Sequence, residues 1–308
     1  MTAPGLSVII PAHNAAATLP AALEALCAQD EGSIDEVVVV DNRSTDGTAA
    51  LARGFSDRLP VRTVPATEKA GASYARNVGA LAAGHALLAF CDADDIVGPH
   101  WAAGMRRTLT GEDAVVTGTL RYWDGTAPTG PLDSIGTPVT PYAILGHLRF
   151  AAGCNLGVRR DTYLRSGGMD ESFDSGSEDV DFSWRVQEQG AGFTVCEDAW
   201  ILYRQRPSAR GIFRQKYGYS RERVLLWIRA AQRGHRLDGV SWKSSILRAA
   251  AVPVLWARGR RDPETAGNCG ARLGDLVGLV RYRALRRKAR AHLLTPGKAA
   301  DPDTQERA

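Results

Sequence analysis

The sequence lacks several features that would assign its class directly. Its five cysteines lie far apart and form no CxxC pair or other metal-ligand spacing, so we expect reduced thiols rather than a disulfide framework. No apolar run approaches the roughly 20 residues that a membrane-spanning helix needs. The opening segment MTAPGLSVIIPAHN has no basic stretch ahead of its apolar run, so no signal peptide is expected. These absences favour a cytoplasmic protein.

Two common nucleotide-binding motifs are also missing. No GxGxxG follows the first strand-like segment, which argues against a dinucleotide-dependent oxidoreductase. No GxxxxGK[ST] occurs, which excludes a P-loop enzyme. The segment PAHNAAATLP lacks the Gly-, Arg- and Lys-rich loop that a sugar-nucleotide nucleotidyltransferase needs after its first strand. Nothing in the chain is typical of a nucleic-acid module, so nucleic acid is not an expected partner.

The charges are unevenly distributed along the chain. Residues 1–203 carry 14 Lys and Arg against 26 Asp and Glu, whereas residues 204–308 carry 24 against 8. The overall net charge of +4 therefore hides an acidic part of −12 and a basic part of +16. This asymmetry predicts an acidic catalytic part and a basic appendage that faces an anionic partner.

The first 120 residues alternate between strand-like and helix-like segments. Strand-like segments occupy residues 6–11, 35–41, 61–65 and 85–90, and segments with helical spacing or capping signals occupy 16–29, 44–55 and 70–84. This alternation predicts an α/β fold with a mostly parallel, doubly wound sheet. Further along, we expect a strand over 114–123, a surface loop over 124–141, a helix over 177–190 and one or two short strands within 192–206.

The C-terminal third has a different character. Residues 209–234, 240–261 and 272–294 are Arg-studded helical segments whose apolar stretches are only about a dozen residues long. Such helices are too short to span a bilayer, so they should lie on a membrane surface or pack on the main domain. Residues 295–308 are expected to be disordered.

Polar residues follow three of the expected strands. The first strand is followed by Pro11, Ala12, His13 and Asn14, the second by Asp41 and the turn NRSTDG, and the fourth by the acidic run DADD at 92–95. In open α/β sheets, ligands bind beyond the carboxyl ends of the strands, so these clusters should converge. Carboxylates repel a bare phosphate, but they can hold a diphosphate through Mg²⁺ or Mn²⁺.

Five segments together resemble a known family. SVIIPAHN, EVVVVDNRSTDGT, ARNVGALAAG, FCDADD and SEDVDFSWRVQEQG, in this order and spacing, look like the family 2 glycosyltransferases with a GT-A fold. The resemblance covers roughly residues 5–220. It implies inverting transfer of a sugar from a nucleoside-diphosphate donor to an acceptor hydroxyl. It also implies a GT-A domain over 1–207, with a nucleotide-binding half (1–120) and an acceptor half (121–207), and a basic helical appendage over 208–294.

On the donor side, the resemblance implies roles for several residues. Asp41 would accept a hydrogen bond from the base, typically uracil, the alternative being an Asx turn in DNRSTDG. Arg76 would lie near the diphosphate, the alternative being a solvated helix arginine. In the DXD motif, Asp94 would ligate Mn²⁺ or Mg²⁺, and Asp92 would contact the ribose or reach the metal through water. The full predicted donor set is Pro11, His13, Asn14, Asp41, Arg76, Asp92, Ala93 and Asp94. UDP-sugars are the favoured donors.

The acidic pair Glu178-Asp179 is the predicted catalytic centre. By resemblance, Asp179 is the general base that removes the proton from the acceptor hydroxyl, and Asp181 is the second choice. We expect the helix N-terminus to lower the pKa of this carboxyl. Simple capping by acidic residues is the alternative. The acceptor side is expected to include Cys154, Asn155, Trp184, Arg204 and Arg206. Asp95 is expected to cap the helix that follows it.

The sequence departs from the family pattern at one place. Many relatives carry a His after the last core strand, where Arg204 and Arg206 stand here. An arginine cannot ligate a metal, but its donor fork binds diphosphate. Either the metal has fewer protein ligands, or the arginines share in stabilising the leaving group, and both alternatives stay open.

The substrate side is less defined. The acceptor could be a carbohydrate, a lipid-linked hydroxyl or a small molecule. The basic helices could hold the protein on the anionic inner face of the cell membrane, or they could simply pack on the domain. The alternative to an enzyme is a degenerate family member that binds nucleotide-sugar or acts as a membrane-associated scaffold.

Overall fold

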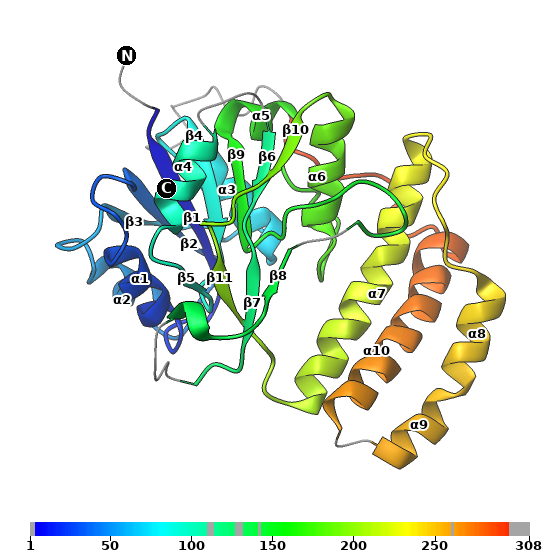
Figure 1. The fold of residues 1–308 in the computed structure, drawn as a ribbon. Coiled ribbons are helices and arrows are strands. Elements are labelled where there is room, and N and C mark those ends of the chain that lie inside the picture. Colours follow the sequence, from blue (N-terminus) through cyan, green and yellow to red (C-terminus); the bar gives the residue numbers. More distant parts are fainter. Residues whose placement is uncertain (1–3, 110–113, 127–131, 141–142, 260–261, 296–308) are drawn as a thin grey trace.

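A computed structural model describes residues 4–109, 114–126, 132–140, 143–259 and 262–295, and its core is a seven-stranded sheet (Figure 1). The strands of this sheet lie in the order β10 (Gly192–Val195), β6 (Ala114–Thr117), β9 (Asn155–Arg159), β4 (Leu87–Cys91), β1 (Leu6–Ala12), β2 (Glu36–Asp41) and β3 (Val61–Pro65). All neighbours pair in parallel except β9, which runs antiparallel to both β4 and β6. The predicted mostly parallel α/β sheet is confirmed.

Helices cover both faces of this sheet. On one face, α1 (Leu19–Cys27), α2 (Thr48–Arg53) and α4 (Trp101–Leu109) pack against Val8 and Ile10. On the other, α3 (Ala72–Ala82), α5 (Arg160–Arg165) and α6 (Glu178–Glu188) pack with Ile9 and Phe90. Since every other side chain of a strand points to the opposite face, strands covered on both sides must be apolar throughout.

The expected strand over 114–123 is two strands that belong to different sheets. β6 ends at Thr117, and β7 (Leu120–Trp123) lies in a second sheet of order β5 (Ile96–Val97), β11 (Ile201–Arg204), β7 and β8 (Pro138–Val139). The chain changes sheets at Gly118, where a Cβ would lie 1.4 Å from the carbonyl oxygen of Ala199. Only glycine allows this close approach. The short helix η1 (Leu132–Ser134) interrupts the predicted loop.

The C-terminal helices stand at one end of the molecule. They are α7 (Ala209–Gln232), α8 (Trp242–Ala250), α9 (Val252–Gly259), α10 (Pro263–Gly278) and a π-helical turn, η2 (Leu279–Ala284). The predicted helix over 240–261 is therefore two helices. The helix predicted over 272–294 is wrong at both ends. It starts at Pro263, because Asp262 caps it by accepting from the Thr265 N–H and Pro263 fits its first turn. The helical structure ends at Ala284, the last residue of η2.

These helices pack closely on one another and on the main domain. Glycines 270, 274 and 278 of α10 face backbone atoms of α7, where a Cβ would lie 2.3–2.8 Å from the nearest of them. Leu225 and Tyr282 share an apolar cluster with Trp184 of α6. Among the described residues, no helix combines the length and the apolarity needed to cross a bilayer. The predicted boundary at 207–208 falls between β11 and α7, and the separate identity of the two parts stays a prediction. The expected disordered tail lies, apart from Thr295, outside the described residues.

Candidate active site

A cavity of about 590 Å³ opens beyond the carboxyl ends of β1, β2 and β4. Nine of the predicted site residues line it, namely Pro11, His13, Asn14, Arg76, Asp92, Ala93, Asp94, Arg204 and Arg206. Its wall also includes Asn42 and residues 70–72, which the sequence did not single out. The polar strand ends thus converge on one cavity, as the parallel strand directions require.

Arg76 is the charged side chain that joins the two acidic motifs. It lies on α3 and is only 4% exposed. Its Nη2 donates to Asp92 Oδ1 at 2.7 Å, and its Nη1 donates to Glu178 Oε1 at 3.0 Å. Burial acts to lower the pKa of Arg76, but the surrounding carboxylates outweigh it and raise the pKa. A solvated helix arginine, the alternative left open by the sequence, is therefore excluded.

The acidic run at 92–95 divides into three different environments. Asp94 Oδ2 accepts from Arg206 Nη1 at 3.1 Å at the cavity wall. Asp95 is 2% exposed; its Oδ1 accepts from the Arg204 N–H at 2.9 Å, whereas its buried Oδ2 has no hydrogen-bond partner. The prediction that Asp95 caps a helix is wrong, because α4 begins only at Trp101 and Asp95 points into the interior instead.

The same run fits a divalent cation. Burial, followed by repulsion from Asp92, raises the pKa of Asp94, and burial with Asp92 and Asp94 raises that of Asp95 well above its usual range. Ligand atoms of Asp92, Asp95 and Cys154 lie within 4.8 Å of one another. One of these three ligand atoms is the Cys154 sulfur, and Asp94 does not belong to the group. The Asp92 carboxylate and the unpartnered Asp95 Oδ2 are oxygen donors of the kind that Mg²⁺ or Mn²⁺ prefers.

The Glu178-Asp179 pair begins α6, after Ser177 in the left-handed region at φ 71°. Asp179 Oδ2 accepts from the Gly153 N–H at 2.9 Å, and Oδ1 accepts from the Val180 N–H at 2.8 Å. The expected lowering of the pKa of Asp179 is wrong. Burial outweighs both backbone hydrogen bonds and Arg76, so the pKa is raised. Burial and the neighbouring Asp179 likewise raise the pKa of Glu178.

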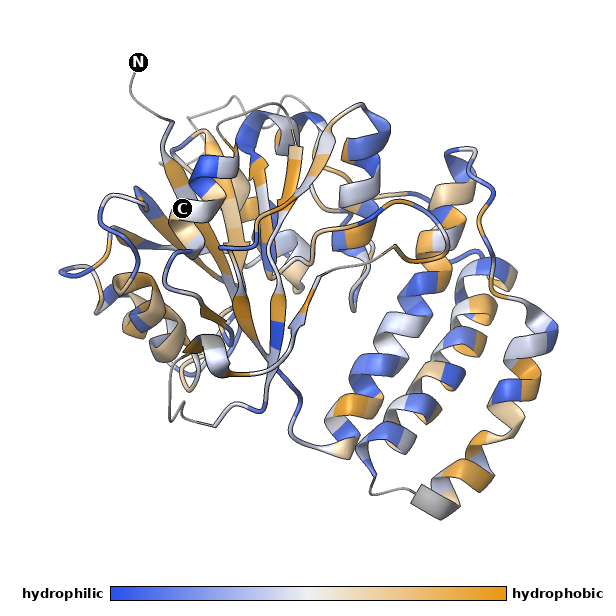
Figure 2. Ribbon diagram, viewed as in Figure 1, coloured by the Kyte–Doolittle hydropathy of each residue, from blue (hydrophilic) through white to orange (hydrophobic). Residues whose placement is uncertain are grey.

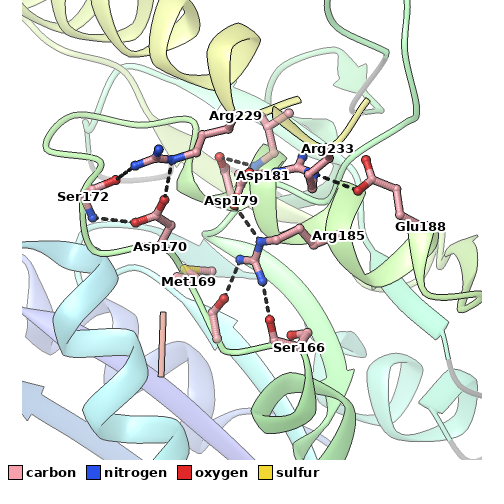
Figure 3. Close-up of polar contacts among 12 residues, drawn as sticks. Ser166, Met169, Asp170, Ser172, Asp179, Asp181, Arg185, Glu188, Arg229 and Arg233 are labelled. Atoms are coloured by element: carbon pink, nitrogen blue, oxygen red, sulfur yellow. Dashed lines mark hydrogen bonds and ion pairs between the residues drawn. The ribbon is translucent and has the colours of Figure 1, made fainter. Parts of the chain in front are cut away.

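Asp181, the second choice for the base, is fully engaged in holding α6. Arg185 Nε donates to its Oδ2 at 2.7 Å and Arg233 Nη1 to its Oδ1 at 2.8 Å (Figure 3). Arg185 also donates to the carbonyl oxygens of Ser166 and Gly168. Asp181 is 1% exposed and has no free oxygen for an acceptor, so it positions the helix rather than acting on substrate.

A model of the family described as glycosyl transferase family 2 matches residues 7–165. The chain belongs to this family. It is 30% identical over 231 residues to validoxylamine A glucosyltransferase of Streptomyces hygroscopicus subsp. jinggangensis, a match that covers 64% of this chain but only 54% of that protein. It is 29% identical over 262 residues to glycosyltransferase AglE of Haloferax volcanii, covering 83% and 80% of the two chains.

Solved structures show the same fold. The mannosyltransferase PcManGT from Pyrobaculum calidifontis, in complex with GDP-Man and Mn²⁺, superposes with a TM-score of 0.59 at 19% identity, over 92% of this chain and 76% of that one. S. aureus TarS 1–349 in complex with UDP-GlcNAc gives 0.55 at 16% identity, over 93% and 92%. At these identities the likeness establishes the fold alone, which is GT-A.

Within this family 2 site, the polar side chains after β2 make more hydrogen bonds within the protein than the sequence predicts. Asp41 Oδ1 accepts from the Ser44 N–H at 3.1 Å, as in the alternative Asx turn, and Asp41 is not part of the cavity wall. The missed residue is Asn42, whose amide donates to the carbonyls of Ala66 and Lys69 and accepts from the Gly71 N–H. Its place directly after Asp41 was the available signal.

Two predicted acceptor-side residues belong to the core instead. Asn155 is fully buried; its Oδ1 accepts from Trp101 Nε1, and its Nδ2 donates to the carbonyls of Thr119 and Ala199. Trp184 is also fully buried and donates to the carbonyl of Leu148. Neither side chain can therefore reach an acceptor.

Cys154 is buried and does not line the cavity. Burial, followed by the charges of Asp95 and Asp92, raises the pKa of its thiol.

Replacing Arg76 by Met should destabilise the fold by about 3–5 kcal/mol, because it leaves buried carboxylates without their shared cation. Arg76 lowers the pKa values of Glu178 and Asp179, so its loss raises both further. A carboxyl whose pKa is raised in the folded state makes the folded protein less stable as the pH rises. The loss of unfolding free energy caused by Arg76→Met should therefore be larger at pH 8 than at pH 5. Urea unfolding at both pH values measures it.

The matched control is Arg58→Met, which removes an exposed arginine that pairs with Glu24 through two contacts. It should shift the unfolding midpoint little at either pH. Equal, pH-independent shifts for the two variants would contradict the bridging role of Arg76.

Proposed function

We propose that the chain transfers a sugar from a nucleoside-diphosphate donor to an acceptor hydroxyl, with inversion, in a single in-line displacement. The observation that carries the proposal is the Arg76 bridge between Asp92 of the DXD motif and Glu178 of the acidic pair, beside a 590 Å³ cavity. A donor-side motif and a base-side motif thereby meet at one place.

The donor diphosphate would lie at the edge formed by Asp92, Asp94 and Arg206. Two structural neighbours support a nucleotide-sugar there, since one is described with GDP-Man and Mn²⁺ and the other with UDP-GlcNAc. Asp94 and Asp92 would hold the divalent cation, which when bound neutralises charge on the leaving diphosphate. A UDP-sugar remains the favoured donor, although Asp41, the predicted base contact, lies outside the cavity wall.

Arg204, the last residue of β11, and Arg206 fit the second explanation for the absent His. Arg206 is half-exposed and pairs with Asp94, so its guanidinium is free to turn to a phosphate oxygen when a cation takes over that carboxylate. Arg204 lines the same wall. Both would therefore share in stabilising the leaving group.

Asp179 would act as the general base. Its carboxylate takes the acceptor proton while the acceptor oxygen bonds to the anomeric carbon and the bond to the diphosphate breaks. The Gly153 N–H holds Oδ2 in place, and burial brings the pKa of the carboxyl up toward the working pH, where a general base is most effective.

Asp179→Asn should lower kcat for transfer by about 10²- to 10⁴-fold, because the amide cannot accept the proton. Binding of the donor nucleotide, measured by calorimetry, should change little. Transfer is measured as nucleoside diphosphate released in the presence of an acceptor.

Asp161→Asn is a matched control, because Asp161 occupies the same position in α5 and likewise accepts from the following N–H. It should leave kcat unchanged. Near-normal turnover by Asp179→Asn would remove Asp179 as the base.

Excess chelator should abolish transfer, and Mn²⁺ or Mg²⁺ should restore it, because the carboxylates at 92–95 repel a bare diphosphate. The measurement is a rate with and without EDTA, followed by back-titration with each ion. Full activity in excess chelator would refute the metal role of Asp94.

The exposed face of α8 and α9 supports peripheral binding of the protein to a membrane that carries the acceptor. Ile246 and Leu247 of α8 and Val254 and Trp256 of α9 are exposed, and Figure 2 shows hydrophobic stretches on both helices at the end remote from the main sheet. Exposed Lys243 and Arg248 flank them. Apolar side chains among cations fit an anionic bilayer surface and thus a lipid-linked acceptor.

The double variant Leu247→Glu/Trp256→Glu should lower binding to phosphatidylglycerol-containing vesicles at least about tenfold, because it places negative charge on this face. Co-sedimentation with the full chain measures binding, and phosphatidylcholine vesicles should bind neither form. Val280→Glu, at an exposed apolar site on η2, is the control. Equal sedimentation of wild type and double variant would refute the membrane role.

A further inference from the structure

Two histidines and a glutamate meet at the C-terminal end of α6, opposite to the end that begins with Glu178-Asp179. His147 ends a turn that starts at Ile144, Glu188 is the last residue of α6, and His235 follows the end of α7. His147 Nε2 lies 3.4 Å and His235 Nε2 lies 2.9 Å from the same atom, Glu188 Oε1. One donor atom from each residue lies within 4.8 Å of the other two.

The two separations from Glu188 Oε1 are close to those in a tetrahedral metal shell. Metal–ligand bonds of about 2.0–2.1 Å place tetrahedral ligand atoms about 3.3–3.4 Å apart. The 3.4 Å separation already has this value, and the 2.9 Å separation needs an opening of about half an ångström. The three side chains are 17–30% exposed, so an ion and a water ligand can enter without unfolding.

The surroundings fix the glutamate and supply negative potential. Glu188 Oε2 forms an ion pair with Arg233 Nε at 2.8 Å (Figure 3). The other oxygen, Oε1, is the one that contacts both histidines. The site lies at the carboxyl ends of both α6 and α7, where helix dipoles favour a cation. The Asp238 carboxylate also lies close to Gly146 of the same turn. These offset the positive charge of Arg233.

We propose that His147, Glu188 and His235 form a second metal site that binds Zn²⁺ or a similar transition-metal dication. Imidazole ligands suit Zn²⁺, whereas the carboxylates at the edge of the cavity suit Mg²⁺ and Mn²⁺, so the two sites favour different ions. The site shares no ligand with the catalytic carboxylates and does not rest on the proposed function.

The bound ion would join three segments that are distant in sequence. The 144–148 turn is held to α6 through the Trp184 Nε1–Leu148 O hydrogen bond and the edge contact of His147 with Trp184. His235 adds the end of α7. Zn²⁺ would therefore clamp the C-terminal helices to the helix that begins with Glu178-Asp179.

The test is a Zn²⁺ titration of the metal-stripped full chain in excess MgCl₂, which keeps the oxygen site occupied. Wild type should bind one more equivalent of Zn²⁺ than His147→Ala or His235→Ala, with affinity at that site weakened at least about 100-fold in each variant. His100→Ala is the control, because His100 pairs with a single carboxylate, Asp30, on the surface. It should bind as wild type does.

A second measurement needs no variant. Co²⁺ added to wild type should give the strong visible absorption of a tetrahedral N/O site, and prior Zn²⁺ should suppress it. Zn²⁺ bound with the same stoichiometry and affinity by wild type and His147→Ala means an adventitious ion only and overturns the proposal. The absence of tetrahedral Co²⁺ bands in wild type overturns it as well.

Discussion

The site depends on one buried guanidinium. Arg76 is brought in by α3, and it holds a carboxylate at the end of β4 against one at the start of α6, across 102 residues of sequence from Glu178. The desolvation of this buried charge is offset by the two carboxylates that face it, and the desolvation of those carboxylates is offset by Arg76. Gly153 makes room for it, since a Cβ there would lie 3.1 Å from Arg76 Cζ. The same Gly153 donates its N–H to Asp179.

The negative charge of the site exceeds what Arg76 can balance. The pKa values of Asp94, Asp95, Glu178 and Asp179 are all raised, and burial is the first cause for each. Burying these carboxyls together costs free energy of folding. The rest of the fold offsets that cost through the two covered sheet faces and the ion pairs that anchor α6 to α7. A cation between the carboxylates and a proton on the base are the changes that relieve it, and both belong to the proposed reaction.

Much of this arrangement could be predicted from local pattern. The strand at 35–41 is recognisable because a strand buried on both faces is apolar through its centre, whereas the partly exposed strand at 61–65 follows only from the alternation of strands and helices. Asp92 and Asp94 are recognisable because charge follows the buried strand 87–91 abruptly. What the pattern missed depends on contacts between distant segments. The change of sheet at Gly118 depends on the close approach of the Ala199 carbonyl. The burial of Asn155 depends on its hydrogen bonds to the Trp101 indole and the Thr119 carbonyl, which the local sequence does not show. The pKa of Asp179 rises through burial, which a helix-dipole argument does not include.

The most direct test is turnover of a panel of UDP-, GDP- and TDP-sugars by the full chain with Mn²⁺, read as release of nucleoside diphosphate. The account predicts that at least one donor is turned over and that Asp94→Asn abolishes release of its diphosphate. Binding of a donor without any release would instead support a degenerate, non-catalytic family member. Neither binding nor release with any donor would contradict the assignment of the Arg76-centred cavity as a nucleotide-sugar site.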